Sequence, residues 1–105
     1  MPYFNLWQSN ANNQYYFNFR GNNHERVLQS EGYTTEANCR AGINSVKVLS
    51  PYDSSFSRFT ANNGQPYFVM KANNGQSIAS SETYTTTAAR ENAIDLVKTD
   101  RKSVV

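Results

Sequence analysis

Alternation of apolar and polar residues marks a strand at residues 14–20. Tyr15, Phe17 and Phe19 occupy every second position, and the positions between them carry polar or amphipathic side chains. Because successive side chains of a strand point to opposite faces, these three rings are expected to face a core. The same pattern recurs at residues 65–71, which predicts a second strand of the same kind.

The other elements follow from apolar patterns and from residues that favour turns and helix caps. Paired threonines at 34–35 and 85–86 predict helix starts, because a threonine hydroxyl accepts a hydrogen bond from an amide two or three residues on. The first helix is expected to run to about Val48. Val27 and Ile78 are expected to face the core. Strands are predicted at 4–8, 14–20, 26–29, 56–60, 65–71 and 77–80, and turns at 10–13, 21–24, 62–64 and 72–75.

These elements appear in the same order twice. With a shift of 51 positions, residues 12–48 align without a gap on residues 63–99, and 15 of the 37 pairs are identical, where chance gives roughly two. Two repeats are therefore expected, at about 3–50 and about 54–105. Half a chain is too short to bury a core of its own, so residues 1–105 are predicted to form a single domain.

The predicted fold class is α+β. Two tandem β-β-β-α repeats are expected to share one antiparallel sheet, with both helices packed on one face. The tail ends in Val104 and Val105, which are expected to extend the sheet as an edge strand.

Composition narrows the classes of function. The net charge is +2 and the pI is near 8.8, which permits a nucleic-acid partner without requiring one. Cys39 is the only cysteine, so no internal disulfide and no cysteine zinc site can form. There is neither a signal-peptide pattern at the N-terminus nor an apolar run of bilayer length, so we expect a cytoplasmic protein without a membrane partner.

Several of these segments resemble the YegP-like family (UPF0339-type), small bacterial and archaeal proteins without an assigned function. The resemblance rests on residues 14–20 (QYYFNFR), 30–35 (SEGYTT) and 42–47 (GINSVK), and on their second copies. It implies a β-β-β-α unit that occurs as a tandem repeat or as one copy that dimerises. It also implies that the strand after each helix crosses into the partner unit's part of the sheet. No catalytic residue, cofactor or ligand comes with it. The chain departs from the family pattern at His24, where glycine is more typical.

The doubled motif Ser-Glu-x-Tyr-Thr-Thr is the most tempting chemical signature. Glu31 and Glu82 have the chemistry of acids, and Tyr33 and Tyr84 are donors near a helix N-terminus, where anions bind. A structural role is the better interpretation, because a strand-to-helix junction must be made twice whereas a site need not be. We therefore expect replacement of both glutamates to lower the melting temperature before it affects binding.

Catalysis receives little support from the remaining residues. His24 is the only histidine, and it has no counterpart in the second repeat. Cys39 aligns with Arg90, and nothing near it supplies a base to activate a thiol. The sequence shows no phosphate-binding glycine loop and no metal-ligand spacing, so neither a catalytic residue nor a cofactor is predicted.

The sheet face opposite the core is the predicted binding face. Aromatic and basic residues alternate on it, as on platforms that stack single-stranded nucleic acid. The alternative is that cross-strand aromatic pairs stabilise the sheet and the cations keep it soluble. The low net charge favours this alternative. The candidate residues are Tyr16, Arg20, Tyr67, Lys71, Trp7 and Arg26.

The sequence favours a small non-enzymatic interaction module that acts through its sheet face or a strand edge, with a protein partner or a second copy of itself. Binding of single-stranded nucleic acid through the aromatic-basic face is the alternative function. An enzyme of unknown class is the third hypothesis, because short loops leave little room for a pocket.

Overall fold

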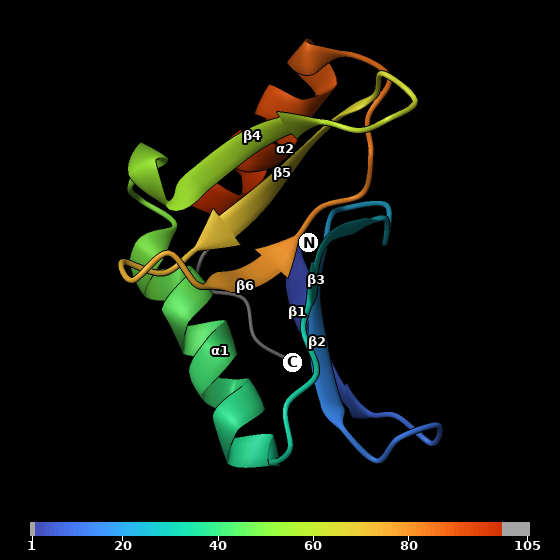
Figure 1. Cartoon of the computed structure of the whole chain (residues 1–105), viewed down its shortest axis with the longest axis vertical. Coiled ribbons are helices and arrows are strands. Elements are labelled where there is room, and N and C mark those ends of the chain that lie inside the picture. The colour runs from blue at the N-terminus through green and yellow to red at the C-terminus, as the bar shows by residue number, and fades with distance from the viewer. Residues whose placement is uncertain (1, 100–105) are drawn as a thin grey trace.

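The chain folds into an α+β structure in which the same elements follow one another twice (Figure 1). The computed structural model describes residues 2–99. A 3-10 turn, η1 (Asp53–Ser55), joins the two repeats. The first repeat contains β1 (Tyr3–Gln8), β2 (Tyr15–Arg20), β3 (Arg26–Ser30) and α1 (Glu36–Leu49), and the second contains β4 (Phe56–Thr60), β5 (Pro66–Lys71), β6 (Ser77–Ser80) and α2 (Thr87–Thr99).

The strands form one antiparallel sheet in the order β1-β2-β3-β6-β5-β4. The predicted fold class and the tandem order of the repeats are confirmed. β4 follows α1 and pairs with β5 in the second half of the sheet, as the family resemblance implies. The expected strand at Val104 and Val105 lies outside the described residues, and the single domain at 1–105 with repeats at about 3–50 and 54–105 stays a prediction.

The two halves of the sheet meet over a short central contact. β3 and β6 share only two residue pairs, Gln29 with Ser80 and Ser30 with Ala79. The outer strands pair over five or six residues. The sheet is therefore narrowest where the repeats join, and the strands separate on both sides of that contact.

One apolar core connects both repeats. Phe17 and Phe68 occupy equivalent places in it, and both side chains are 0% exposed. α1 packs on β2 and α2 packs on β5, which covers one face of the sheet (Figure 1). The other buried apolar residues are Phe4, Phe19, Val27, Leu28, Cys39, Ile43, Val46, Phe56, Met70, Ile78, Ala79, Ala93, Ile94 and Val97.

The helix starts are as predicted. Thr35 caps α1, because its hydroxyl accepts a hydrogen bond from the Asn38 amide at 3.1 Å. The Thr86 hydroxyl accepts from the Ala89 amide at 3.0 Å at the start of α2. Each bond satisfies one of the amides that a helix leaves unpaired at its N-terminus.

The predicted turns also form. His24 has a φ of 63°, and Gly75, at the equivalent position, has a φ of 82°. Asn13 and Gly64 likewise have φ values of 60° and 83°. Positive φ explains why asparagine, histidine and glycine occupy these four places.

The prediction for the third strands was incomplete. Val27 and Ile78 are buried, as expected, but Leu28 and Ala79 beside them are both 0% exposed. Strict alternation would point one member of each pair away from the core. The pairing register shifts at both places, between residues 19 and 20 and between residues 70 and 71. A β-bulge of this kind places two successive residues opposite one, so both side chains reach the core.

Candidate interaction face of the sheet

Two stacked aromatic pairs lie on the sheet face that the helices leave open, which we call the outer face. The Trp7 and Tyr16 rings are 5.9 Å apart with an interplanar angle of 21°. Phe59 and Tyr67 are 5.5 Å apart at 26°. Both pairs arise because their members are direct cross-strand partners, Trp7 with Tyr16 and Phe59 with Tyr67. Phe59 is 38% exposed and the other three rings are half-buried.

Phe59 is the member of this face that sequence reasoning missed. The first hairpin connection is one residue longer than the third, since Ser9 bonds Gln14 whereas Ala61 bonds Gln65. Strands β1 and β4 are therefore related by 52 positions rather than 51, and position 7 corresponds to position 59. Allowing one inserted residue in the first turn would have aligned the two rings.

Two of the predicted cations on the outer face, Arg20 and Lys71, are engaged within the fold. Arg20 donates a hydrogen bond from Nη1 to the His24 carbonyl oxygen at 2.7 Å. Lys71 places its Nζ 5.4 Å from the centre of the Phe59 ring, within the range of a cation–π contact. The charges thus support the turn and the aromatic pair.

Arg26 is a bridge between the repeats. Its Nε donates to Glu82 Oε2 at 3.0 Å, and its Nη1 lies 3.3 Å from Gln29 Oε1. About half of each charged side chain remains exposed, so the pair contributes little to stability, of order 0–1 kcal/mol. The structure therefore brings together Trp7 with Tyr16 and Lys71 with Phe59, and it gives Arg26 an anionic partner.

Asn18 lies at the centre of the outer face, opposite Asn5 on one side and Gln29 on the other. The alternation predicted that it would face solvent, but its side chain is only 2% exposed. Its Oδ1 atom is buried without a hydrogen-bond partner among the described residues. Val69 occupies the equivalent place in the second repeat, so this position does not require a polar side chain.

The serine of the doubled Ser-Glu-x-Tyr-Thr-Thr motif has a structural role. The Ser30 hydroxyl accepts a hydrogen bond from the Phe17 amide at 2.9 Å and donates one to the Glu31 carbonyl oxygen at 2.8 Å. Ser81 makes the equivalent bonds at 2.9 and 2.7 Å. Each hydroxyl continues the sheet pairing where the strand turns away, so the motif must occur once in each repeat.

The tyrosine of the motif packs against the core. Tyr33 stacks on Phe17 with 6.3 Å between ring centres, and Tyr84 stacks on Phe68 with 6.5 Å. A Cβ atom on Gly42 would lie 2.4 Å from the Tyr33 hydroxyl oxygen, so the helix passes close to this ring. Burial raises the pKa of Tyr33, and it raises the pKa of Tyr84 to about 12. Neither phenol is a base near neutral pH.

The residues with catalytic potential are engaged or buried. His24 Nδ1 lies 3.0 Å from the Tyr3 hydroxyl on an exposed turn. Cys39 is fully buried, and burial raises the pKa of its thiol to about 11, which keeps it protonated and unreactive. Within residues 2–99, no cluster of histidine, cysteine and carboxylate side chains could hold a metal ion.

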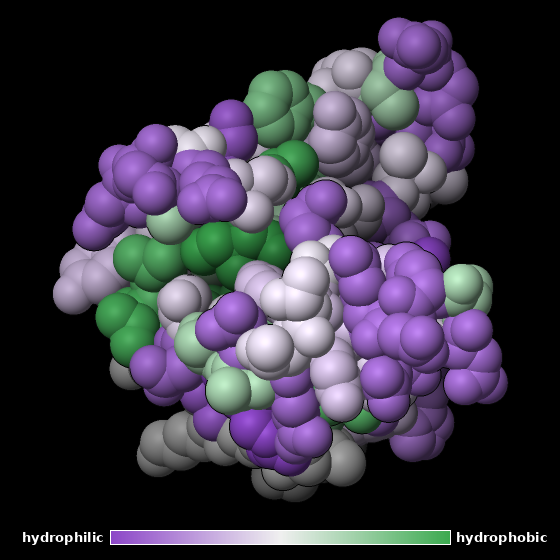
Figure 2. Space-filling view, turned by 60° about the horizontal axis from the view of Figure 1, so that its bottom comes forward, coloured by the Kyte–Doolittle hydropathy of each residue, from purple (hydrophilic) through white to green (hydrophobic). Residues whose placement is uncertain are grey.

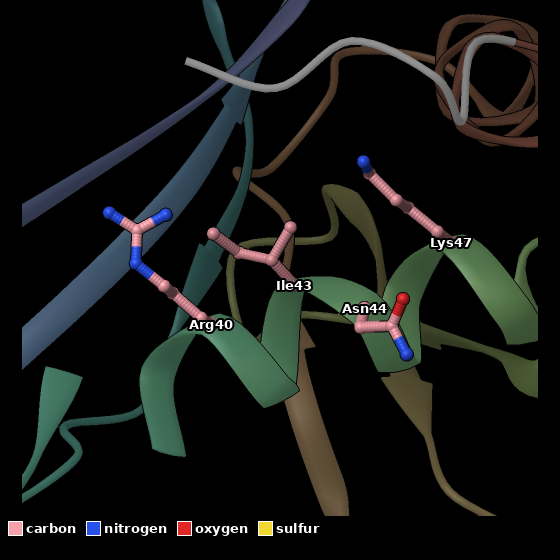
Figure 3. A pocket seen from close by; sticks show the side chains of 4 residues that line it. All are labelled: Arg40, Ile43, Asn44 and Lys47. Atoms are coloured by element: carbon pink, nitrogen blue, oxygen red, sulfur yellow. The ribbon is translucent and has the colours of Figure 1, made fainter. Parts of the chain in front are cut away.

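The surface of the helices carries small hollows. Figure 3 shows one of about 160 Å³ on α1, lined by Arg40, Ile43, Asn44 and Lys47. The Arg40 guanidinium pairs with Glu36 at 2.9 Å, and Lys47 lies 5.9 Å from the Phe4 ring centre. Both cations at its rim are thus engaged. On the face shown in Figure 2, apolar side chains form a band bounded by hydrophilic ones.

The fold and its outer face define a class: a small α+β protein of two β-β-β-α repeats with a solvent-facing aromatic sheet. None of the helices within residues 2–99 has the length and apolar character needed to cross a membrane. A family model described as "Domain of unknown function (DUF1508)" matches residues 10–55 and 61–102, one match in each repeat. The chain belongs to this family, and the resemblance inferred from its motifs is confirmed.

Relatives with known sequence cover most of the chain. It is 49% identical over 87 residues to a UPF0339 protein of Bordetella pertussis, with 83% of this chain and 78% of that protein covered. It is 41% identical over 93 residues to the UPF0339 protein YegP of Shigella flexneri, with 89% and 84% covered.

Solved structures share the whole fold. The solution NMR structure of a UPF0339 protein from Shewanella oneidensis matches with a TM-score of 0.90 at 35% identity, covering 98% of this chain and 88% of that one. The solution NMR structure of yegP from Escherichia coli, called a protein of unknown function, matches with a TM-score of 0.89 at 38% identity, covering 98% and 90%. The family is thus one of unknown function.

Proposed function

We propose that the protein is a non-enzymatic binding module that holds a protein partner on the outer face of its sheet. The two stacked pairs, Trp7–Tyr16 and Phe59–Tyr67, support this function. Aromatic side chains supply large contact areas at low entropic cost and are enriched at protein interfaces. Because these rings lie outside the core, the fold does not bury their whole surface, and the exposed part can contact a partner.

The edges of the sheet extend this proposed face. Trp7 lies on β1 and Phe59 lies on β4, and these are the two edge strands among the described residues. An extended segment that paired with either edge would use the backbone groups that are unpaired among the described residues, and it would contact the neighbouring aromatic pair. A second copy of the chain is one such partner, since its own edge strand offers the same groups.

Single-stranded nucleic acid remains the alternative function, and the charges favour it less. Arg20 donates to a backbone carbonyl, Arg26 pairs with Glu82, and Lys71 lies over a ring. Binding to phosphates depends on cations that are free to replace counterions. A net charge of +2 supplies little additional attraction.

The test is capture of partners by the protein and by variants of this face. Trp7→Ser combined with Phe59→Ser is expected to remove proteins that the unchanged chain captures from lysate of the source cell. Tyr52→Ser is the matched control, because Tyr52 is 60% exposed and lies outside the strands. Partners retained by the double variant would exclude the outer face as their binding site.

Fluorescence separates the two kinds of partner. Trp7 is the only tryptophan, so its emission reports directly on contact at this face. A purified protein partner is expected to change this emission in a way that salt affects little. Saturable quenching by a single-stranded oligonucleotide, lost steeply as salt rises, would instead support nucleic-acid binding.

A further inference from the structure

The short contact between β3 and β6 leaves a hollow on each side of it. The first hollow has a volume of about 380 Å³ and is lined by Glu31, Gly32, Tyr33, Ser45, Ala72, Gln76, Ser77 and Ile78. The second has a volume of about 230 Å³ and is lined by Glu25, Val27, Tyr84, Ala89, Asn92, Ala93 and Leu96. Each hollow combines the tyrosine and helix of one repeat with the third strand of the other.

The two hollows are related by the internal repeat. Tyr33 in the first corresponds to Tyr84 in the second, 51 positions later. Ser45 in the first corresponds to Leu96 in the second, so a hydroxymethyl group replaces an isobutyl group on the helix wall. This exchange contributes to the larger volume of the first hollow.

A second exchange leaves a carboxylate without a cation. In the second repeat Glu82 accepts hydrogen bonds from the Arg26 guanidinium, which bridges β3 to the segment after β6. The equivalent residues are Glu31 and Ser77, and both line the first hollow. The Ser77 side chain is too short to reach the Glu31 carboxylate in the way that Arg26 reaches Glu82. Within residues 2–99 the Glu31 carboxylate has no ion pair.

We propose that the first hollow binds an alkylguanidinium group, with its cation on the Glu31 carboxylate and its alkyl stem against Ile78 and Tyr33. The Arg26–Glu82 pair shows how this fold holds such a group, because two guanidinium nitrogens reach one carboxylate oxygen there. The planar fork of a guanidinium suits this arrangement better than a compact ammonium. Because Ser45 stands where the second hollow has Leu96, the first hollow has room for the alkyl stem.

This inference is independent of the proposed outer-face function. The first hollow opens between β6 and the segment after β3, and none of the four stacked rings of the outer face lines it. Tyr33 and Ile78 form apolar parts of its wall, and Ser45, Gln76 and Ser77 offer polar atoms beside them. If the first hollow fails to bind a guanidinium, the proposed function of the outer face is unaffected, and the reverse also holds.

The experiment is a two-dimensional ¹⁵N NMR titration of the whole protein with ethylguanidinium chloride at constant ionic strength. The amides of Gly32 and Ser77 are expected to shift in a saturable way. Ethylurea has a similar shape without the charge, and ethylammonium has the charge without the fork. Both controls are expected to bind more weakly, by up to about fivefold, since a charge-assisted hydrogen bond at an exposed carboxylate is lost or misaligned.

Two variants examine the site itself. Glu31→Gln keeps the shape of the hollow and is expected to weaken ethylguanidinium binding by up to about fivefold, the upper end for an exposed ion pair. Ser77→Arg supplies the cation from within the chain, as Arg26 does in the second repeat, and is expected to abolish the shifts. Because Ser77 is exposed at the start of β6, this variant is expected to fold. Unchanged binding by either variant would overturn the proposal.

The opposite substitution, in the second repeat, is expected to create a binding site rather than remove one. Arg26→Ser frees the Glu82 carboxylate and is expected to create a second set of saturable shifts, near residue 82. Free arginine and an acetylated, amidated Gly-Arg-Gly peptide then distinguish the source of the guanidinium. Tighter binding of the peptide assigns it to an arginine of a protein, and tighter binding of free arginine assigns it to a small molecule. The absence of shifts at residues 32 and 77 with every guanidinium compound would refute the site.

Discussion

Replacing Ser30 by alanine tests the structural role of the doubled motif most directly. The hydroxyl is the hydrogen-bond acceptor for the Phe17 amide at 2.9 Å, and it donates to the Glu31 carbonyl oxygen at 2.8 Å. Ser30 is 5% exposed and Phe17 is 0% exposed. Water therefore has poor access to the amide that Ser30→Ala leaves unpaired.

The magnitude follows from that burial. A buried donor left without a partner costs about 1–3 kcal/mol. We therefore expect Ser30→Ala to lower the free energy of unfolding by about 2 kcal/mol. For a domain of this size, 1 kcal/mol shifts the melting temperature by about 4–8 °C. The expected loss is then roughly 8–16 °C.

The assay is urea unfolding followed by circular dichroism, with the slope of the transition used to check that the compactness of both states is unchanged. Ser81→Ala is expected to cost about half as much, because Ser81 makes the same bonds but is half-exposed, so water replaces the hydroxyl. Ser57→Ala on β4 is the control and is expected to stay within about 0.5 kcal/mol of the unchanged chain. If Ser30→Ala matched this control, the structural explanation of the motif would be wrong.

Three further predictions concern Asn18 at the centre of the sheet, the stability of the protein at acid pH, and the reactivity of Cys39. Asn18→Val is expected to leave stability unchanged or to raise it by about 1 kcal/mol, because it removes a buried oxygen without a partner; a large loss in thermal unfolding would contradict this. Hydrogen bonds from Arg58 and Lys98 lower the pKa of Asp53 to about 2. Its stabilising effect is therefore present above the unfolded pKa of about 4 and lost as the pH falls towards 2. Asp53→Asn should flatten the melting temperature against pH in that window, and an equally steep profile would count against the ion pairs. Cys39 should react with a thiol reagent at pH 8 only when the protein opens, because it is fully buried and its thiol pKa is raised to about 11; prompt labelling of the folded protein would refute that.

The glutamates of the motif need a revised expectation. Their replacement was predicted to lower the melting temperature, yet the hydrogen bonds that the motif makes within its own repeat come from its serine and threonine side chains. Glu82 forms a half-exposed pair with Arg26, worth of order 0–1 kcal/mol. Glu31 forms no ion pair within residues 2–99. The double replacement is now expected to lower the melting temperature only slightly, in the same thermal scan.

Much of the fold could be predicted because its determinants are local. Strand alternation placed Phe17 and Phe68, threonine caps placed both helix starts, and turn chemistry placed the four hairpin turns in which the residues of positive φ lie. The burial of Leu28 and Ala79 could not be predicted in this way. A bulge depends on the register between two strands, and alternation along one strand contains no information about its partner.

In the candidate site, too, features set by local sequence could be predicted, and features set by contacts between distant residues could not. Tyr16, Tyr67 and Lys71 could be placed on the outer face because each lies on a strand whose alternation is readable. The bond between Arg26 and Glu82 joins residues 56 positions apart, and no local pattern relates them. The burial of Asn18 could not be predicted, because alternation assigns a residue to a face of the sheet and does not say how far that face is covered.

The narrow join at the middle of the sheet has a consequence for assembly. Each half carries three mutually paired strands and a helix, and a short connection through η1 links it to the other half. A chain that opens at this connection exposes two complementary halves, and a second opened chain offers the same pair. Reciprocal exchange of halves would then give a dimer that contains the contacts of the monomer, and shortening residues 50–55 would favour that dimer over the monomer.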